Sequence, residues 1–243
     1  EWDLPDAFPK TRSTPPITLE INGRRLFAKG SNWVNPDVFP GRVNEETYKQ
    51  LLSLAADANM NILRVWGGGG VNKEPFFHWC DRLGLMVWQE FPLACNEYPD
   101  KPAYLQVLER EAVSIVTRLR SHPCVVLWCG GNELFNAWSG MTDQHHALRL
   151  LNKVCYELDR RTPFIMTSPL YGMAHGHYRL LDSPTEEFIT KMAEQKNTAY
   201  TEFGVPGSNS REYLLQFVAK EELDGCRSIS DLNRLMPFMA API

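Results

Sequence analysis

Short apolar runs alternate with longer segments of helical periodicity along most of this chain, and the alternation limits the folds available to it. Each run is rich in β-branched or aromatic residues and has the length of a buried strand. The predicted strands are Leu26–Gly30, Asn61–Trp66, Leu85–Phe91, Val125–Gly131, Pro163–Ser168, a weaker one at His175–Tyr178, and Thr198–Phe203. Strands that alternate with helices favour a parallel sheet covered by helices.

Apolar residues recur with the 3.6-residue period of a helix in three of the segments between these runs. The helices predicted there are Glu45–Met60, Ala103–Ser121 and Asp143–Asp159. A capping box at Ser183–Glu186 predicts a further helix over Pro184–Gln195. Ser210 is the expected N-cap of a helix over Arg211–Leu223.

The predicted fold class is α/β, and the alternation favours a (β/α)8 TIM barrel, which closes with eight parallel strands. The predicted strands stop one short of that number, and Gly225–Ile243 holds no convincing strand. We therefore expect the barrel to be truncated before its eighth strand. A doubly wound open sheet is the structural alternative. The glycine run Gly67–Gly70 lacks the G-x-G-x-x-G spacing of a dinucleotide-binding turn, which weakens that alternative.

The start of the chain differs in composition from the rest. Residues 1–16 are polar and proline-rich and are predicted to be a linker, and residues 17–243 are predicted to form one barrel domain that is incomplete at its C-terminal end. The segment Ile17–Phe27 is typical of a hairpin with Asn22-Gly23 as its turn.

Composition excludes several classes of partner and cofactor. The net charge of −4 comes with no basic patch, and no apolar stretch reaches membrane-spanning length, so we expect neither nucleic acid nor membrane binding. The six cysteines show no Cys-x-x-Cys pair and no zinc spacing with histidine, so buried thiols are favoured over disulfides or a metal site. No cofactor is predicted. Because no Asn-x-Ser/Thr acceptor occurs, a bacterial periplasmic, secreted or cytoplasmic protein is favoured over a eukaryotic secretory one.

Two glutamates stand where strands are predicted to end. Glu133 closes the run that begins at Val125, and Glu202 lies in Tyr200–Gly204. Catalytic residues of barrel enzymes lie at the carboxyl ends of strands. A pair of carboxylates is the usual equipment for cleaving a glycosidic bond.

Five motifs in order along the chain resemble glycoside hydrolase family 2, nearest its β-mannosidase and exo-β-glucosaminidase branch. They are Phe27–Trp33, Ala58–Gly69, Gly84–Phe91, Leu127–Glu133 and Thr201–Gly204, and the resemblance covers about residues 17–205. It implies a retaining exo-β-glycosidase barrel without a cofactor, acting on an oligosaccharide or glycoconjugate. It also implies upstream β-sandwich domains, with residues 1–16 as the linker from an immunoglobulin-like one. The chain departs from the branch at Gly131, where Asn is usual.

The resemblance gives roles to three residues near the two strand ends. Glu133 corresponds to the acid/base, and Glu202 corresponds to the nucleophile. Asn132 corresponds to a residue that contacts the 2-hydroxyl of the sugar, and we expect it to point to the rim of the cleft. For Glu133 the alternative is a surface cap of the following helix, and for Asn132 it is turn chemistry.

Charged and aromatic residues in the same motifs are further candidates for substrate binding. Arg64, a charge inside an apolar strand, is expected to pair with Glu202, and the alternative is a structural ion pair. Glu90 is expected either to support such a pair or to bind sugar. Trp33 and Trp66, at strand ends, are the first choices as sugar platforms, although core packing is the commoner role of a tryptophan. Trp128, in mid-strand, is expected in the core.

The resemblance also implies a polar cluster on the sixth strand. Tyr178 is predicted to donate a hydrogen bond to the nucleophile, and His177 is predicted to contact substrate. A His-x-His metal site with His175 is the alternative, but further ligands are not evident nearby.

Two other functions stay open at this point. One is a different activity of the same family, namely β-galactosidase, β-glucuronidase or exo-β-glucosaminidase. The other is a carbohydrate-binding barrel without catalysis. Catalysis requires that Glu133 and Glu202 face each other across one cleft.

Overall fold

The computed structural model describes residues 18–170, 172–176, 178, 181–183, 186–187, 190, 192, 194, 197–204, 210–216 and 218–226. The linker expected over residues 1–16 and most of the C-terminal segment Gly225–Ile243 lie outside these residues. The chain divides into two compact units, which are Glu1–Ala174 with Asn197–Thr201, and His175–Lys196 with Glu202–Ile243.

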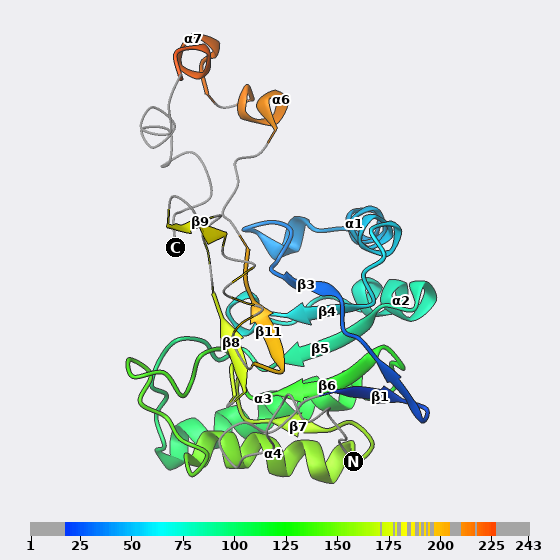
Figure 1. The fold of residues 1–243 in the computed structure, drawn as a ribbon. Helices are drawn as coiled ribbons and strands as arrows, with labels where there is room; N and C mark the ends of the chain where they lie inside the picture. The colour runs from blue at the N-terminus through cyan, green and yellow to red at the C-terminus, as the bar shows by residue number, and fades with distance from the viewer. Residues whose placement is uncertain are drawn as a thin grey trace. The chain divides into compact units, whose positions relative to one another are not determined.

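A five-stranded parallel sheet dominates the first unit, and its strands follow one another in chain order (Figure 1). The strands are β3 (Gly30–Trp33), β4 (Ile62–Val65), β5 (Met86–Glu90), β6 (Val125–Cys129) and β7 (Phe164–Ile165). The helices that connect them are α1 (Glu45–Asp57), α2 (Glu74–Leu83), α3 (Pro102–Leu119) and α4 (His146–Leu158). This arrangement confirms the predicted α/β class and is how a (β/α)8 barrel begins.

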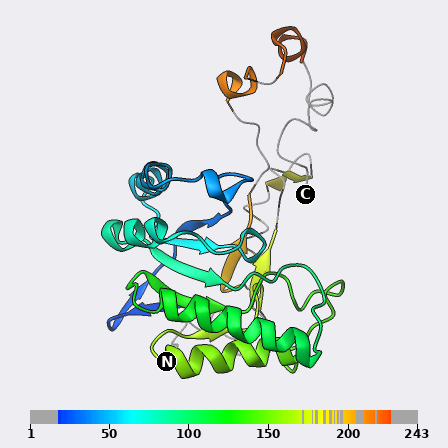
Figure 2. The same cartoon turned by 180° about the vertical axis from the view of Figure 1, so that it is seen from behind.

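Helices cover one face of the sheet, and a separate apolar layer lies on the other. α1 contacts α2 and α3 contacts α4, and Figures 1 and 2 both show α3 and α4 side by side. Leu63, Val87 and Trp128 belong to the core shared with the helices. Ile62, Met86 and Leu127 belong to the second cluster on the opposite face. Burial on both faces explains why β4 and β6 are apolar almost throughout.

The predicted hairpin is present as β1 (Leu19–Ile21) paired with β2 (Arg24–Leu26). Its turn residues Asn22 and Gly23 have φ angles of 51° and 75°, as a type I′ turn requires. Leu19 and Ile21 pack against the second apolar cluster.

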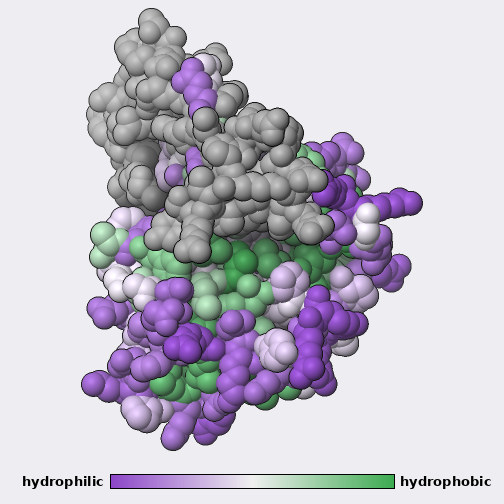
Figure 3. All heavy atoms as spheres, turned by 60° about the horizontal axis from the view of Figure 1, so that its bottom comes forward, coloured by the Kyte–Doolittle hydropathy of each residue, from purple (hydrophilic) through white to green (hydrophobic). Residues whose placement is uncertain are grey.

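On the face shown in Figure 3, apolar surface gathers near the centre of the view and hydrophilic residues lie around its periphery.

The first barrel strand lies later in the chain than predicted. The prediction was Leu26–Gly30, whereas β3 begins at Gly30. The Asn61 side chain accepts from the amide of Lys29 at 2.8 Å and donates to the carbonyl of Phe27 at 2.8 Å, so a side chain takes part in holding the backbone before β3. The Lys29 carbonyl also accepts from the backbone amides of Asn61 and Ile62, and the register of β3 with β4 starts with Gly30 opposite Ile62.

The helix predictions had mixed outcomes. The three periodic segments form α1, α3 and α4 with shorter bounds, whereas α2 was not predicted. The helix predicted from Pro184 is wrong at its start, because Glu186–Glu187 is strand β10, paired with β9 (Leu181–Ser183). Ser210 caps its helix as predicted by accepting from the amide of Tyr213, but the segment forms two short helices, α6 (Arg211–Leu214) and α7 (Lys220–Asp224).

Two later strands, β8 (Met173–His175) and β11 (Ala199–Glu202), pair with each other. The amide of Thr198 donates to Gly172, and the amide of Gly176 donates to Glu202, so the two strands run in the same direction. Among the residues that the structure describes, no helix is both long enough and apolar enough to cross a membrane.

The backbone that follows β6 is wedged between the loops after β5 and β7. A Cβ atom on Gly130 would lie 2.2 Å from the carbonyl oxygen of Met166, and one on Gly131 would lie 2.3 Å from that of Leu93. Gly131 also has a φ of 151°, which L residues rarely adopt. The Asn that is usual in the β-mannosidase branch therefore has no room on this backbone.

We predict that Gly131→Ala destabilises the protein by about 1–3 kcal/mol, because the new methyl group meets backbone on the neighbouring loop. Gly41→Ala is the matched control, since a Cβ at Gly41 meets nothing within 4 Å. Its effect should stay within about 0.5 kcal/mol. Urea unfolding of both variants measures the difference in their free energies of unfolding. Equal unfolding midpoints would show that the backbone after β6 is not tightly held between the neighbouring loops.

Candidate active site

Glu133 follows β6 in a fixed and unusual backbone conformation. Its φ of 53° is left-handed, which is uncommon for a residue with a side chain. The amide of Glu133 donates to the carbonyl of Ser168 at 2.7 Å, and its own carbonyl accepts from the hydroxyl of Ser139 at 2.7 Å. The side chain is half-buried, and its Oε2 lies 3.5 Å from the thiol of Cys95. Glu133 therefore belongs to a fixed loop after a strand, as a catalytic barrel carboxylate does.

Asn132 is buried rather than placed at a rim. Only 2% of its surface is exposed. Its Oδ1 accepts from Nη2 of Arg64 at 2.6 Å, and its Nδ2 donates to the sulfur of Cys95 at 3.2 Å. Its amide and carbonyl bond to Leu93 and to Cys95 on the loop after β5. The expectation that Asn132 points to the cleft rim was wrong, because Arg64 and Cys95 hold its side chain inside.

Arg64 and Glu90 form a buried ion pair between adjacent strands β4 and β5. Nε of Arg64 donates to Oε1 of Glu90 at 2.8 Å, and Oε2 of Glu90 accepts from the amide of Gly67 at 2.8 Å. Burial raises the pKa of the Glu90 carboxyl, and the Arg64 guanidinium and the Gly67 amide counteract that rise. Glu90 is 1% exposed, so the ion-pair alternative is confirmed for it and a direct sugar contact is not supported.

The Arg64 guanidinium has further partners in the first unit. Nη1 donates to Oδ1 of Asn32 at 2.9 Å and to the carbonyl of Thr201 at 3.3 Å. Thr201 immediately precedes Glu202 in the chain. The structural ion pair proposed as the alternative role of Arg64 is therefore present, and its pairing with the Glu202 carboxylate stays a prediction.

Glu202, the last residue of β11, has two polar neighbours within the second unit. Its Oε2 accepts from the Tyr178 hydroxyl at 3.0 Å and lies 3.5 Å from Nδ1 of His175. The predicted hydrogen bond from tyrosine to this glutamate is thus present. His177 lies outside the described residues, so its substrate contact and the His-x-His alternative stay predictions.

The tryptophans separate into core and loop residues. Trp33 is buried, its ring centroid lies 4.8 Å from that of Phe76, and its Nε1 donates to Asn72. The prediction of Trp33 as a sugar platform was wrong, because its place in β3 directs the ring toward the helix layer. Trp128 is in the core, as predicted. Trp66 is half-buried with its ring against Gly68, so it keeps the loop position expected of a platform.

Two features near Glu133 were not predicted from the sequence. Cys95, beyond the end of β5, reaches both Asn132 and Glu133. The hydroxyl of Ser168 bonds to that of Thr201 at 2.7 Å, between the segment after β7 and strand β11. Polar residues directly after predicted strands were the available signal, but spacing in sequence does not show which of them meet.

One cluster in the first unit has the residue types of a metal site. The ligand atoms of Asp81, His122 and Cys124 lie within 4.8 Å of one another. Asp81 accepts from the amide of Cys124 and bonds to Nδ1 of His122 at 2.6 Å. Burial raises the pKa of the Cys124 thiol, which disfavours the thiolate that a metal binds. These contacts describe a structural cluster that joins α2 to the start of β6.

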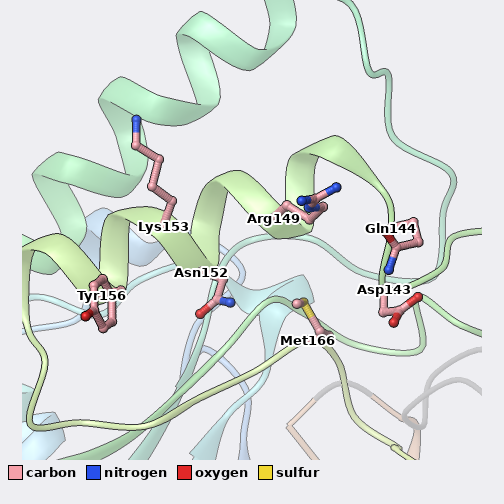
Figure 4. A pocket seen from close by; sticks show the side chains of 7 residues that line it. All are labelled: Asp143, Gln144, Arg149, Asn152, Lys153, Tyr156 and Met166. Carbon is pink, nitrogen blue, oxygen red and sulfur yellow. The ribbon is translucent and has the colours of Figure 1, made fainter.

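A polar hollow of about 520 Å³ lies beside α4 (Figure 4). It is lined by Asp143, Gln144, Arg149, Asn152, Lys153, Tyr156 and Met166. None of these belongs to the residues gathered around Glu133. The residues that line this hollow are therefore separate from the candidate active-site residues.

Comparison with known proteins places this geometry in a family. A family model described as "Glycosyl hydrolases family 2, TIM barrel domain" matches residues 17–219. The chain is 39% identical over 169 residues to a β-mannosidase of Rattus norvegicus, which covers 64% of this chain and 19% of that protein. It is 42% identical over 115 residues to β-mannosidase B of Thermothelomyces thermophilus, covering 47% of this chain and 14% of that protein. The chain thus spans about a fifth or less of these relatives.

Solved structures agree with this placement. The crystal structure of a β-D-mannosidase from Dictyoglomus thermophilum superposes with a TM-score of 0.78 at 33% identity, over 88% of this chain and 28% of that one. An exo-chitosanase of Amycolatopsis orientalis, at 18% identity and a TM-score of 0.66 over 88% of this chain and 26% of that one, shares the fold. By its fold, its strand motifs and the family match, the chain belongs to the TIM barrel domain of glycosyl hydrolase family 2.

Proposed function

We propose that this chain is the catalytic barrel of a retaining exo-β-glycosidase that removes terminal β-linked sugars, with β-mannosides as its preferred substrates. The observation that carries the proposal is the position of Glu133 after β6 and of Glu202 at the end of β11, in a barrel of this family. These are the fourth and seventh strands when counted from β3 and without the β9–β10 hairpin. Catalytic groups of TIM barrels lie at such carboxyl ends.

In the proposed mechanism Glu133 protonates the leaving oxygen while Glu202 attacks the anomeric carbon. A covalent glycosyl-enzyme forms, and the aglycone leaves with the proton. Water then gives a proton to Glu133 and attacks the same carbon, which frees Glu202 and releases the sugar with retained configuration. All steps use side chains of this chain and need no cofactor.

The surroundings of each glutamate suit its proposed role. The Tyr178 hydroxyl, 3.0 Å from Oε2, fixes the orientation of the Glu202 carboxylate. The Glu133 backbone is bonded on both sides, so the point from which its side chain extends is fixed relative to β6. Trp66 is the remaining aromatic candidate for packing against the sugar. Preorganisation of this kind lowers the cost of reaching the transition state.

The preference for mannose rests on the named relatives. The rat and Dictyoglomus proteins carry the name β-mannosidase at 39% and 33% identity. Solved β-glucuronidases, such as that of Parabacteroides merdae at 19% identity, support the fold alone. Because the chain spans 28% of the Dictyoglomus protein, we propose that upstream β-sandwich domains of the same polypeptide are its structural partners.

The assay that tests the proposal compares aryl β-glycosides on the whole polypeptide that carries this chain. We expect the highest kcat/KM with 4-nitrophenyl β-mannoside, ahead of the β-glucoside, β-galactoside, β-glucuronide and β-glucosaminide. A higher kcat/KM with another of these glycosides would change the preferred sugar that we propose and would leave the enzyme class unchanged. Binding of sugars without turnover of any of them would favour the carbohydrate-binding alternative.

Azide rescue tests which glutamate plays which role. Glu202→Ala should abolish turnover, and azide should restore it with formation of the inverted glycosyl azide, since the anion fills the space of the nucleophile. Glu133→Ala should be rescued with retained configuration, because Glu202 still forms the intermediate. Product stereochemistry is read by NMR, and the opposite pair of outcomes would mean that the two roles are exchanged.

The separation of the two carboxyl groups is a second prediction. A crystal structure of the whole polypeptide should place the carboxyl groups of Glu133 and Glu202 about 5–5.5 Å apart, the separation of retaining enzymes. A separation of about 6.5–9.5 Å would indicate an inverting mechanism instead. Carboxylates on opposite sides of the barrel would exclude both.

The hydrogen bond from Tyr178 should contribute to turnover. Tyr178→Phe removes a donor 3.0 Å from Glu202, and we expect kcat/KM to fall about 10- to 100-fold, as for a lost bond to a charged group. Tyr156→Phe is the matched control, because Tyr156 is exposed on α4. Equal kinetics for the two variants would remove Tyr178 from the site.

A further inference from the structure

We propose that Cys95 is a positioning residue for Glu133, as the last donor of a hydrogen-bond chain that starts at Arg64 and passes through Asn132. This inference rests on the acid/base role proposed above for Glu133. It assigns a function to a thiol that lies outside the two strand ends.

The geometry of the chain is continuous within the first unit. Nη2 of Arg64 donates to Oδ1 of Asn132 at 2.6 Å. Nδ2 of Asn132 then donates to Sγ of Cys95 at 3.2 Å, and Sγ donates to Oε2 of Glu133 at 3.5 Å. The sulfur thus accepts one bond and donates another, which a protonated thiol does and a thiolate does not.

All three bonds point in the same direction, from a cation toward a carboxylate. Each donor is polarised by the group behind it, so bonds in such a chain strengthen one another. The positive charge at the start is itself fixed by the buried Glu90, 2.8 Å from Nε of Arg64. A thiol is a weak donor, so we assign Cys95 the orientation of one carboxylate oxygen rather than a large share of the catalysis.

The backbone holds the thiol in place. The amide of Cys95 donates to the carbonyl of Asn132 at 2.9 Å, and its neighbour Ala94 bridges to the same residue. All six cysteines lie in the described part of the chain, and Cys95 is the one that is exposed. A reagent can therefore reach the proposed positioning thiol while Cys80, Cys124, Cys129 and Cys155 stay buried.

The dependence of kcat/KM on the leaving group distinguishes a defect in positioning the acid from a general loss of activity. A phenyl glycoside needs protonation of its leaving oxygen, whereas a 2,4-dinitrophenyl glycoside needs little. In the whole polypeptide, Cys95→Ala should lower kcat/KM about tenfold for the phenyl glycoside of the preferred sugar and less than about twofold for the dinitrophenyl one. Cys95→Ser, which keeps a donor and an acceptor, should recover most of the loss.

Cys226→Ala is the matched control, because Cys226 is only partly buried and its thiol contacts the carbonyl of Glu222 on α7. It should leave both rates unchanged. An equal loss on both substrates in Cys95→Ala would mean that the thiol is merely structural. No loss on either would overturn the inference.

A second measurement does not depend on glycosidase activity. Iodoacetamide alkylates the thiolate, and at an alkaline pH that ionises Glu133 the neighbouring carboxylate disfavours that form. Mass spectrometry of the Cys95 peptide should show alkylation about tenfold faster in Glu133→Gln than in the native protein, with Glu109→Gln as the remote control. If the protein proves inactive on every glycoside, this rate still tests the contact. An unchanged rate in Glu133→Gln would overturn the inference even in an active enzyme.

Discussion

The buried guanidinium of Arg64 is the interaction on which the arrangement of the first unit depends. Its three nitrogens bond to Asn32 on β3, Glu90 on β5, Asn132 after β6 and the carbonyl of Thr201 on β11. Arginine suits this position because its donors form a rigid planar fork that stays charged. Removing one partner of such a buried pair leaves a charge without compensation, at a cost of about 3–5 kcal/mol.

This polar layer lies on the same face of the sheet as the second apolar cluster. Strand residues alternate between faces, so Arg64 follows Ile62, and Glu90 follows Met86 and Trp88. The guanidinium also lies 5.8 Å from the centroid of the Trp88 ring. An apolar layer followed by a charged layer toward the carboxyl ends of the strands is how a barrel combines a stable interior with a reactive end.

The segment after β6 shows how residues at the carboxyl ends of the strands are held in place. Glycines at 130 and 131 allow close contact with the carbonyls of Met166 and Leu93, and backbone bonds then fix Asn132 and Glu133 from both sides. The left-handed conformation of Glu133 persists because its neighbours determine it. The left-handed backbone and the Cys95 contact both bear on the orientation that we propose for the Glu133 carboxyl group.

Local chemistry allowed much of this protein to be predicted. Strand–helix alternation gave the α/β class, Asn22-Gly23 gave the hairpin, Ser210 gave a helix cap, and strand-end glutamates gave the candidate site. These features depend on neighbours a few residues away, so a sequence contains them directly. The bond between Tyr178 and Glu202 was also expected, but through family resemblance rather than through spacing.

Contacts between distant segments decided the rest. Trp33 entered the helix-side core, Asn61 bound the backbone before β3, and Glu90 became the buried partner of Arg64. Cys95 came to lie beside Glu133 through the pairing of two loops that are far apart in sequence. Which face a side chain takes, and which partner it meets, depends on strand register and on the burial of charge. Both are set only when non-local segments pack together, so the sequence determined the kinds of elements and the tertiary structure determined which of their side chains meet.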